Sequence, residues 1–285
     1  MPELDPRLTP ARPELAAKHL EGLVSAARFV DGETREVIDA QAPLRRAPSP
    51  DAALGTEALK GERVTVYEST DEGWSWGQLQ SDGYVGWLPT GALGPPGPPA
   101  THKVAALRTL VFPGPSINSP PIEALSLGCR LVIERTTDTL AVTASGGFVP
   151  ARHLVPATAT ETDFVAIAEW FLGAPYLWGG KTSFGLDCSG LVQLALTAHG
   201  VACPRDSDMQ EMSLGTVVAT GPDFDNLRRG DLLFWKGHVA IVRDRNSIVH
   251  ANAFHMAVAI ESLTEAIARI KRSGGDVTSV KRIRQ

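Results

Sequence analysis

Residues 185–193, with the sequence GLDCSGLVQ, place Cys188 where a glycine-containing loop meets an apolar run of helical character. The first turn of a helix has free backbone N–H groups and the positive end of the helix dipole, and both lower the pKa of a thiol. The position of Cys188 at a predicted helix start therefore indicates a nucleophile. A single cysteine is more often a small buried apolar residue, so other residues have to decide between the two interpretations.

Two histidines follow at positions that suit such a nucleophile. His238 begins the apolar run 238–242, and His250 lies near the end of the run 247–251. Antiparallel strands joined by the short turn at residues 244–246 would bring the two side chains together. A thiol, an imidazole and a third group that orients the imidazole are the parts of a cysteine peptidase. Each histidine alone would be read as a packing or surface residue.

The elements around these residues predict an α+β arrangement, with one buried helix packed on an antiparallel sheet. An amphipathic helix is expected over residues 162–173, with Thr162 as its cap, and the apolar helix from Cys188 ends at Gly200. A capping box at residues 262–265 opens a further helix to about residue 271. The other expected elements are strands at 231–235, 238–242, 247–251 and within 277–284, and a short helix capped by Asp206 or Ser207.

The first half of the chain has a different pattern of apolar and turn-forming residues. Helical spacing of leucines predicts a helix over residues 9–28, with Thr9 as cap. Short β-rich runs separated by glycine, aspartate and proline follow from residue 36, and they recur with a period of about 63 to 66 residues. Residues 94–100 (GPPGPPA) join the two copies, and this proline-rich composition predicts a stiff linker without regular structure.

Composition narrows the function classes. The 285 residues include 27 Lys and Arg against 32 Asp and Glu, a net charge of −5, which favours neither nucleic acid nor an anionic membrane as a partner. The N-terminal sequence lacks the features of a signal peptide, and no run is apolar enough to span a membrane, so a cytoplasmic location is expected. Three cysteines at unrelated spacings indicate neither a disulfide framework nor a zinc site. No cofactor or metal is expected.

Four segments, in this order within residues 160–285, resemble the NlpC/P60 family of papain-like cysteine peptidases: YLWGG, GLDCSGLVQ, GDLLFWKGHVAIV and IVHAN. The β-rich copies resemble bacterial SH3-like domains through LRRAP, Trp74, Trp76 and GYVGWLP, and the aromatic residues would alternatively just fill small cores. The resemblance implies a papain-like catalytic domain preceded by two small all-β barrels. The expected boundaries are 1–34 for an N-terminal helix and lead-in, 35–94 for the first SH3-like domain, 95–157 for the linker and second SH3-like domain, and 158–285 for the catalytic domain.

The resemblance also implies roles. Cys188 is the nucleophile, His238 the general base and then acid, and His250 the orienting third member. Tyr176 would line the oxyanion hole together with the Cys188 backbone N–H. The family cleaves bacterial cell-wall peptides, commonly between γ-linked D-glutamate and a diamino acid.

A subgroup with two SH3-like modules acts on small released peptides and demands a free N-terminal L-alanine. By the same resemblance Asp187, Ser189 and Tyr84 would bind the α-ammonium group of that alanine. The other groove positions matched are Trp178, Asp206 and Ser207, with Asp206 a candidate partner for the free amine of the diamino acid. Asp187 and Asp206 have a simpler interpretation as helix caps.

The expected function is that of a cytoplasmic γ-D-glutamyl-diamino-acid endopeptidase that recycles cell-wall peptides. Two alternatives stay open. A papain-like core also supports amidases and acyltransferases that act on other acyl donors. Two SH3-like modules would also suit a non-catalytic peptidoglycan-binding protein. The diamino acid, lysine or diaminopimelate, is not distinguished at this point.

Overall fold

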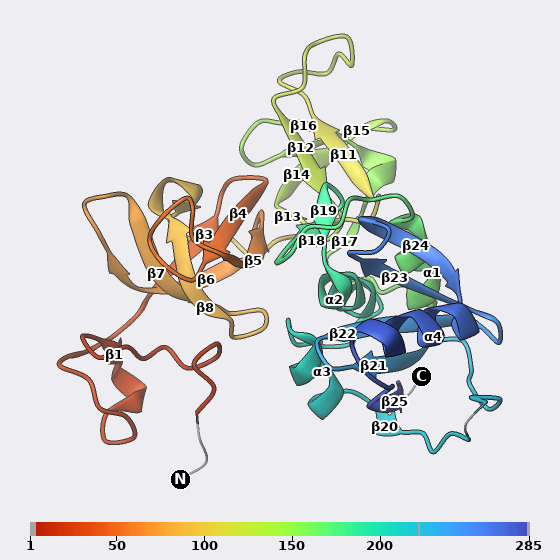
Figure 1. Cartoon of the computed structure of the whole chain (residues 1–285). Coiled ribbons are helices and arrows are strands. Elements are labelled where there is room, and N and C mark those ends of the chain that lie inside the picture. Colours follow the sequence, from red (N-terminus) through yellow and green to blue (C-terminus); the bar gives the residue numbers. More distant parts are fainter. Residues whose placement is uncertain (1–3, 222, 284–285) are drawn as a thin grey trace. The chain divides into compact units, whose positions relative to one another are not determined.

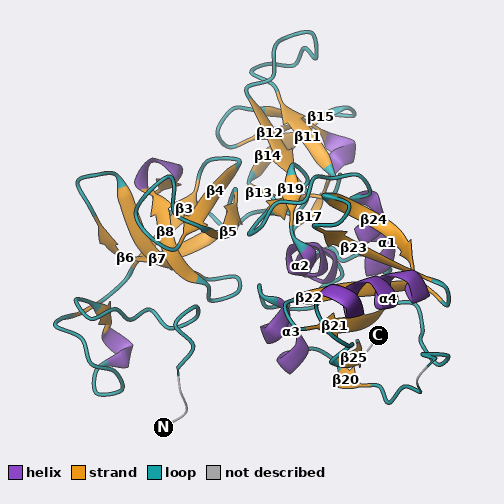
Figure 2. Cartoon of the chain, viewed as in Figure 1, coloured by secondary structure: helices purple, strands orange, loops and turns teal. Residues whose placement is uncertain are grey.

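The structure is a computed structural model that describes residues 4–221 and 223–283 (Figure 1). The chain forms two compact units, Met1–Ala159 and Thr160–Gln285. The four α-helices of the described residues lie in the second unit, whereas the first is built from strands and short 3-10 turns (Figure 2). The ends of the expected lead-in (1–34) and of the expected last strand (277–284) include residues outside the described part.

The N-terminal segment is extended, so the predicted helix over residues 9–28 is wrong. Leu15 is fully buried, where it packs against Trp76 and Trp87 of the first barrel. Gly22 has a φ of +82°, in the left-handed region, and interrupts the segment. Contacts with the barrel therefore override the helical spacing of the leucines. The elements formed here are β1 (Ala16–Ala17), a 3-10 turn (Lys18–Leu20) and β2 (Phe29–Val30).

An antiparallel sheet of seven strands follows, in the order β5-β4-β8-β7-β6-β3-β9. Trp76 and Trp87 are buried in its core, and the Arg12 guanidinium lies 4.3 Å from the ring centre of Trp76. These two aromatic residues are thus core residues, whereas Trp74 is partly exposed. The strands are β3 (Glu33–Val37), β4 (Gln41–Arg45), β5 (Leu54–Leu59), β6 (Arg63–Ser69), β7 (Trp74–Leu79), β8 (Val85–Pro89) and β9 (Leu93–Gly94).

Of the predicted linker 94–100, residues 95–100 form neither helix nor strand, as their composition predicts, whereas Gly94 belongs to β9. The β-strands after them repeat features of the first barrel. A glycine with positive φ precedes β8 at Gly83 and β16 at Gly146, and a 3-10 turn follows each of these strands. The second set is β10 (His102–Val104), β11 (Arg108–Val111), β12 (Glu123–Ser126), β13 (Arg130–Leu131), β14 (Ile133–Thr136), β15 (Leu140–Thr143), β16 (Phe148–Pro150) and β17 (Leu154–Pro156).

The second unit has an antiparallel sheet in the order β20-β25-β21-β22-β23-β24 (Figure 1). Its strands are β20 (Thr216–Val217), β21 (Asp231–Trp235), β22 (His238–Asp244), β23 (Ser247–Asn252), β24 (Ala257–Ser262) and β25 (Ser279–Arg282). A separate two-stranded ladder pairs β18 (Lys181–Thr182) with β19 (Gly185–Leu186). The helices are α1 (Phe164–Trp170), α2 (Cys188–Ala198), α3 (Ser207–Ser213) and α4 (Leu263–Ser273). Strands β21, β22, β23 and β25 and the four helices correspond to predicted elements, whereas β18, β19, β20 and β24 were not predicted.

Apolar packing holds α4 on one face of this sheet. Leu263, Ala266 and Ile270 of α4 share a buried cluster with alternate residues of β21 to β23, such as Trp235 and Ile248. Helices α1 and α2 pack against β22 and β23. The first nine residues of α2 are all buried, so α2 is the central helix that its apolar composition predicts.

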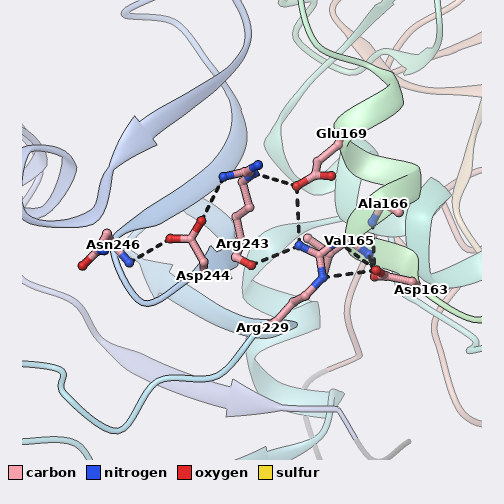
Figure 3. A network of polar contacts seen from close by, with 8 residues as sticks. All are labelled: Asp163, Val165, Ala166, Glu169, Arg229, Arg243, Asp244 and Asn246. Atoms are coloured by element: carbon pink, nitrogen blue, oxygen red, sulfur yellow. Dashed lines mark hydrogen bonds and ion pairs between the residues drawn. The ribbon is translucent and has the colours of Figure 1, made fainter.

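Helix α1 begins one residue later than the predicted cap. Asp163, and not Thr162, accepts hydrogen bonds from the N–H groups of Val165 and Ala166. Asp163 also pairs with Arg229, and a network of ion pairs continues through Glu169 (Figure 3). The network ties α1 to the end of β22 at the protein surface. Among the described residues, no helix has the length and apolar character needed to cross a membrane.

Candidate active site

Cys188 is the first residue of α2. Asp187 is the N-cap, and its Oδ1 accepts a hydrogen bond from the N–H of Gly190 at 2.8 Å. Gly190 fits here because a Cβ on it would lie 2.4 Å from the carbonyl oxygen of Gly180. The glycines of this region thus let the preceding loop pack directly on the first turn of α2. That packing fixes the backbone on both sides of Cys188.

The two predicted histidines meet. Nε2 of His238 lies 2.9 Å from Nδ1 of His250, and the ring centres are 5.2 Å apart. His238 comes from the start of β22 and His250 from β23, which pair antiparallel. The ring of Trp235, directly opposite His238 on β21, packs beside it at 5.6 Å. The hairpin geometry predicted from the sequence therefore holds.

Cys188 and the histidines belong to one site. The backbone N–H groups of Val239, the residue after His238, and of Ser189 lie close enough to the Cys188 thiol to lower its pKa, and α2 packs against β22. Cys188 is 7% exposed. The start of β22 therefore lies against the start of α2 at the sulfur atom.

Burial controls the protonation of this site. The pKa of the Cys188 thiol is raised to about 12, chiefly by burial and secondly by the nearby Asp187 carboxylate. The N–H groups of Val239 and Ser189 lower that pKa, as does the Arg205 guanidinium, but they do not offset burial. The prediction that the helix start lowers the thiol pKa is therefore wrong as a net direction.

Burial shifts the pKa of the His238 imidazole in the opposite direction. The pKa of His238 is lowered to about 3, chiefly by burial, with smaller lowering effects of His250 and Arg269 and an opposing effect of Glu261. At neutral pH the site without substrate therefore holds a neutral thiol and a neutral imidazole. A neutral imidazole can accept a proton, as a general base must.

Tyr176 lies in the loop before β18, where its backbone bridges to Leu186 and its N–H donates to the carbonyl of Met256. Burial raises the pKa of its phenol, and electrostatic interactions with Cys188 and Asp187 raise that pKa further. The Tyr176 hydroxyl is thus a neutral donor close to the thiol. Its role at an oxyanion stays a prediction.

Arg205 is a site residue that the sequence reasoning missed. Its side chain is fully buried and donates to both carboxylate oxygens of Asp187, at 2.9 and 2.8 Å. It also donates to Oγ of Ser189 at 3.0 Å and to the carbonyl of Gly180 at 3.1 Å. The second oxygen of Asp187 accepts the N–H of Gly179 as well. Asp187 therefore holds the loop, the helix start and Arg205 together.

The sequence reasoning also missed Glu261 and Arg269, which continue the hydrogen bonding from His250. Nε2 of His250 is 3.1 Å from Oε2 of Glu261 on β24. Two nitrogens of Arg269 on α4 donate to that carboxylate at 2.9 and 2.6 Å. His255 lies close enough to form a potential three-ligand metal group with His250 and Glu261, their ligand atoms being within 4.8 Å of one another. Because Arg269 already supplies a positive charge to Glu261, we assign no metal to this group.

The remaining predicted residues lie on other elements. Trp178 is largely exposed on the loop before β18. Asp206 is the N-cap residue of α3, without a side-chain capping bond, and Ser207 begins that helix. Tyr84 belongs to the first unit, on the turn between β7 and β8, and is 3% exposed. The substrate contacts of these residues stay predictions, as does the binding of an ammonium group by Asp187 and Ser189.

Comparisons with known proteins agree with this arrangement. Residues 44–93 match the family described as the bacterial dipeptidyl-peptidase Sh3 domain, and residues 173–272 match the NlpC/P60 family. The gamma-D-glutamyl-L-lysine dipeptidyl-peptidase of Bacillus subtilis (strain 168) is 30% identical over 240 residues, which cover 76% of this chain and 78% of the relative. Dipeptidyl-peptidase 6 of Lysinibacillus sphaericus is 28% identical, over 80% of this chain and 91% of its own.

A solved structure shows the same fold. The crystal structure of an NlpC/P60 family protein from Bacillus cereus ATCC 10987 superposes with a TM-score of 0.71. The match covers 88% of this chain and 99% of that one, at 21% sequence identity. The α+β architecture with an SH3-like domain is therefore confirmed.

Proposed function

The chain belongs to the NlpC/P60 family, and from this premise we propose that it hydrolyses the bond between γ-linked D-glutamate and a diamino acid in short cell-wall peptides. The chain is a peptidase that acts on peptides derived from peptidoglycan. The proposed cleavage rests mainly on one observation. The Cys188 thiol lies close to the start of β22, where His238 is hydrogen-bonded to His250.

The reaction proceeds in two steps. His238 accepts the proton of Cys188 while the sulfur attacks the γ-carbonyl carbon of D-glutamate. The carbon–nitrogen bond then breaks, and His238 returns the proton to the amine of the departing diamino acid. Water, activated by His238 in turn, hydrolyses the resulting thioester and releases the acyl part with Cys188 as a thiol. The N–H of Cys188 and the hydroxyl of Tyr176 stabilise the oxyanion in both steps.

A free L-alanine amine is the proposed recognition element at the other end of the substrate. Asp187 and Ser189 flank the nucleophile, and Tyr84 completes the predicted set. Since Arg205 already pairs with both oxygens of Asp187, the ammonium group would meet a neutralised carboxylate. Arg205 also donates to Oγ of Ser189, but Ser189 is neutral, so Ser189→Ala tests the pocket without leaving a buried charge unpaired. A demand for a free amine would restrict the enzyme to released peptides, as in peptidoglycan recycling. The cytoplasmic location stays a prediction.

The test uses L-Ala-γ-D-Glu-L-Lys, its diaminopimelate analogue and the N-acetylated form of each, with products followed by mass spectrometry. We expect the wild type to release the diamino acid from the free-amine peptides only. Cys188→Ala should be inactive, and Cys203→Ala, a change at another buried cysteine, should be active. Ser189→Ala should raise KM for the free-amine peptides.

Other outcomes would redirect the assignment. Cleavage of these peptides by Cys188→Ala would refute the mechanism. Equal cleavage of free and acetylated peptides would keep the nucleophile and discard the amine pocket. Cleavage of neither peptide would favour another acyl donor or a binding role.

A further inference from the structure

A continuous row of hydrogen bonds runs away from the nucleophile across three strands. It passes from His238 to His250 at 2.9 Å and from His250 to Glu261 at 3.1 Å. Arg269 then holds both oxygens of Glu261. The members come from β22, β23, β24 and α4, so the row joins separate elements of the second unit. Its last two residues have no part in the reaction described above.

Strand register explains why these side chains share one face. His250 pairs with Ala259 on β24, and opposite residues of neighbouring strands point to the same side of a sheet. Glu261 lies two residues beyond Ala259 and so points to that side as well. Arg269 extends from α4, which covers this face. The contact is therefore built into the sheet and does not depend on a surface rotamer.

The donors and acceptors along the row fix its polarity. Glu261, held by two nitrogens of Arg269, is an ionised carboxylate and can only accept hydrogen bonds. Nε2 of His250 must then carry a hydrogen, which leaves Nδ1 of the neutral ring as an acceptor. Nε2 of His238 must donate to it, and Nδ1 of His238 keeps a free lone pair. That lone pair is what a general base needs.

We propose that Glu261, held by Arg269, is a positioning residue that sets the tautomers of both histidines so that His238 can accept the Cys188 proton. The proposal rests on the roles of Cys188 and His238 given above. An orienting acidic residue of this kind contributes about 10⁴ to kcat in serine peptidase triads. Because Glu261 acts through His250, one residue further from the base, we expect a smaller effect of roughly tenfold.

Charges around the row give the proposal a signature that packing alone would not give. Burial lowers the pKa values of His238 and His250, Glu261 raises both, and Arg269 lowers both. His255 also lowers the pKa of His250. Burial raises the pKa of Glu261, but hydrogen bonds from His250 and Arg269 outweigh it and bring that pKa to about 2. The charged or titratable groups at the thiol end are Asp187, Arg205 and Tyr176.

The experiment measures alkylation of Cys188 by iodoacetamide against pH in the full chain, with peptide mapping to separate Cys188 from Cys129 and Cys203. The reagent needs no recognition of a peptide, so a wrong substrate assignment would leave these rates unchanged. The variants are Glu261→Gln, Glu261→Asp and Arg269→Gln. Glu265→Gln, at an exposed position on α4, is the matched control.

We expect Glu261→Gln to lower the plateau rate of Cys188 alkylation roughly tenfold. The acidic limb of the rate–pH profile should move to lower pH, because the His238 imidazolium loses a stabilising negative charge. Arg269→Gln should move the limb to higher pH, and Glu261→Asp, which keeps the charge, should leave the limb near its wild-type position. An unchanged profile for Glu261→Gln would overturn the proposal. Shifts of the limb in the same direction for Glu261→Gln and Arg269→Gln would overturn it as well.

Discussion

Replacement of Arg205 by leucine tests whether the buried pair with Asp187 organises the site. The Arg205 side chain is fully buried and that of Asp187 is 11% exposed, so the carboxylate would keep its charge without its partner. Breaking a buried pair by removal of one member costs about 3–5 kcal/mol. Asp187 would retain the N–H groups of Gly179 and Gly190, so we expect the lower end, about 3 kcal/mol.

The assay is urea denaturation followed by deuterium uptake in peptides from α2, because only the second unit contains the pair. Arg229→Leu is the matched control. Arg229 is 41% exposed and its partner Asp163 is 46% exposed (Figure 3), and a pair of that kind contributes less than about 1 kcal/mol.

A second substitution identifies the cause of the loss. If the uncompensated charge dominates, Asp187→Asn in the Arg205→Leu background should recover at least about 1 kcal/mol, since asparagine is also a good N-cap. Equal losses for Arg205→Leu and Arg229→Leu would refute the reasoning, and so would a double variant no more stable than Arg205→Leu alone.

Two further predictions concern stability. Gly190→Ala should destabilise the second unit by about 1–3 kcal/mol in urea titrations, because the new Cβ would lie 2.4 Å from the Gly180 carbonyl oxygen. This steric cost should exceed the gain from alanine's higher helix propensity. The control Gly91→Ala, at a position with open space around it, should leave the stability unchanged. The free energy of unfolding should fall by about 1–2 kcal/mol from pH 7 to pH 5. The reason is that His238 binds a proton near pH 6.5 in the unfolded chain but only near pH 3 in the folded protein. An equally large fall in the His238→Asn variant would exclude His238 as the source.

The positions of Cys188 and the two histidines could be predicted because they depend on local features. Cys188 follows an N-cap, and the histidines lie on strands joined by a short turn. Register within one hairpin follows from the turn and the alternation of side chains. Such contacts need no knowledge of how distant elements pack.

Arg205 and Glu261 were missed for the opposite reason. Arg205 meets Asp187 only because the loop before α3 folds back over the start of α2, and no local pattern indicates this. Glu261 had a usable signal, since the run 257–261 pairs with the strand of His250 and ends in an acidic residue. The failed helix at residues 9–28 has the same origin, because burial of Leu15 against the first barrel overrides local spacing.

The direction of the thiol pKa also shows which physical effect wins at this site. A helix start stabilises a nearby anion by about 0.3–1 kcal/mol, and by about 2 kcal/mol in favourable buried geometries. Removing a charge from water costs several kcal/mol unless the charge is paired. With Cys188 buried and Asp187 adjacent, the thiolate is stable only when an imidazolium forms beside it at the same time. The negative charge of Glu261 stabilises that imidazolium through His250, so the reactivity of the cysteine depends on a residue two strands away from His238.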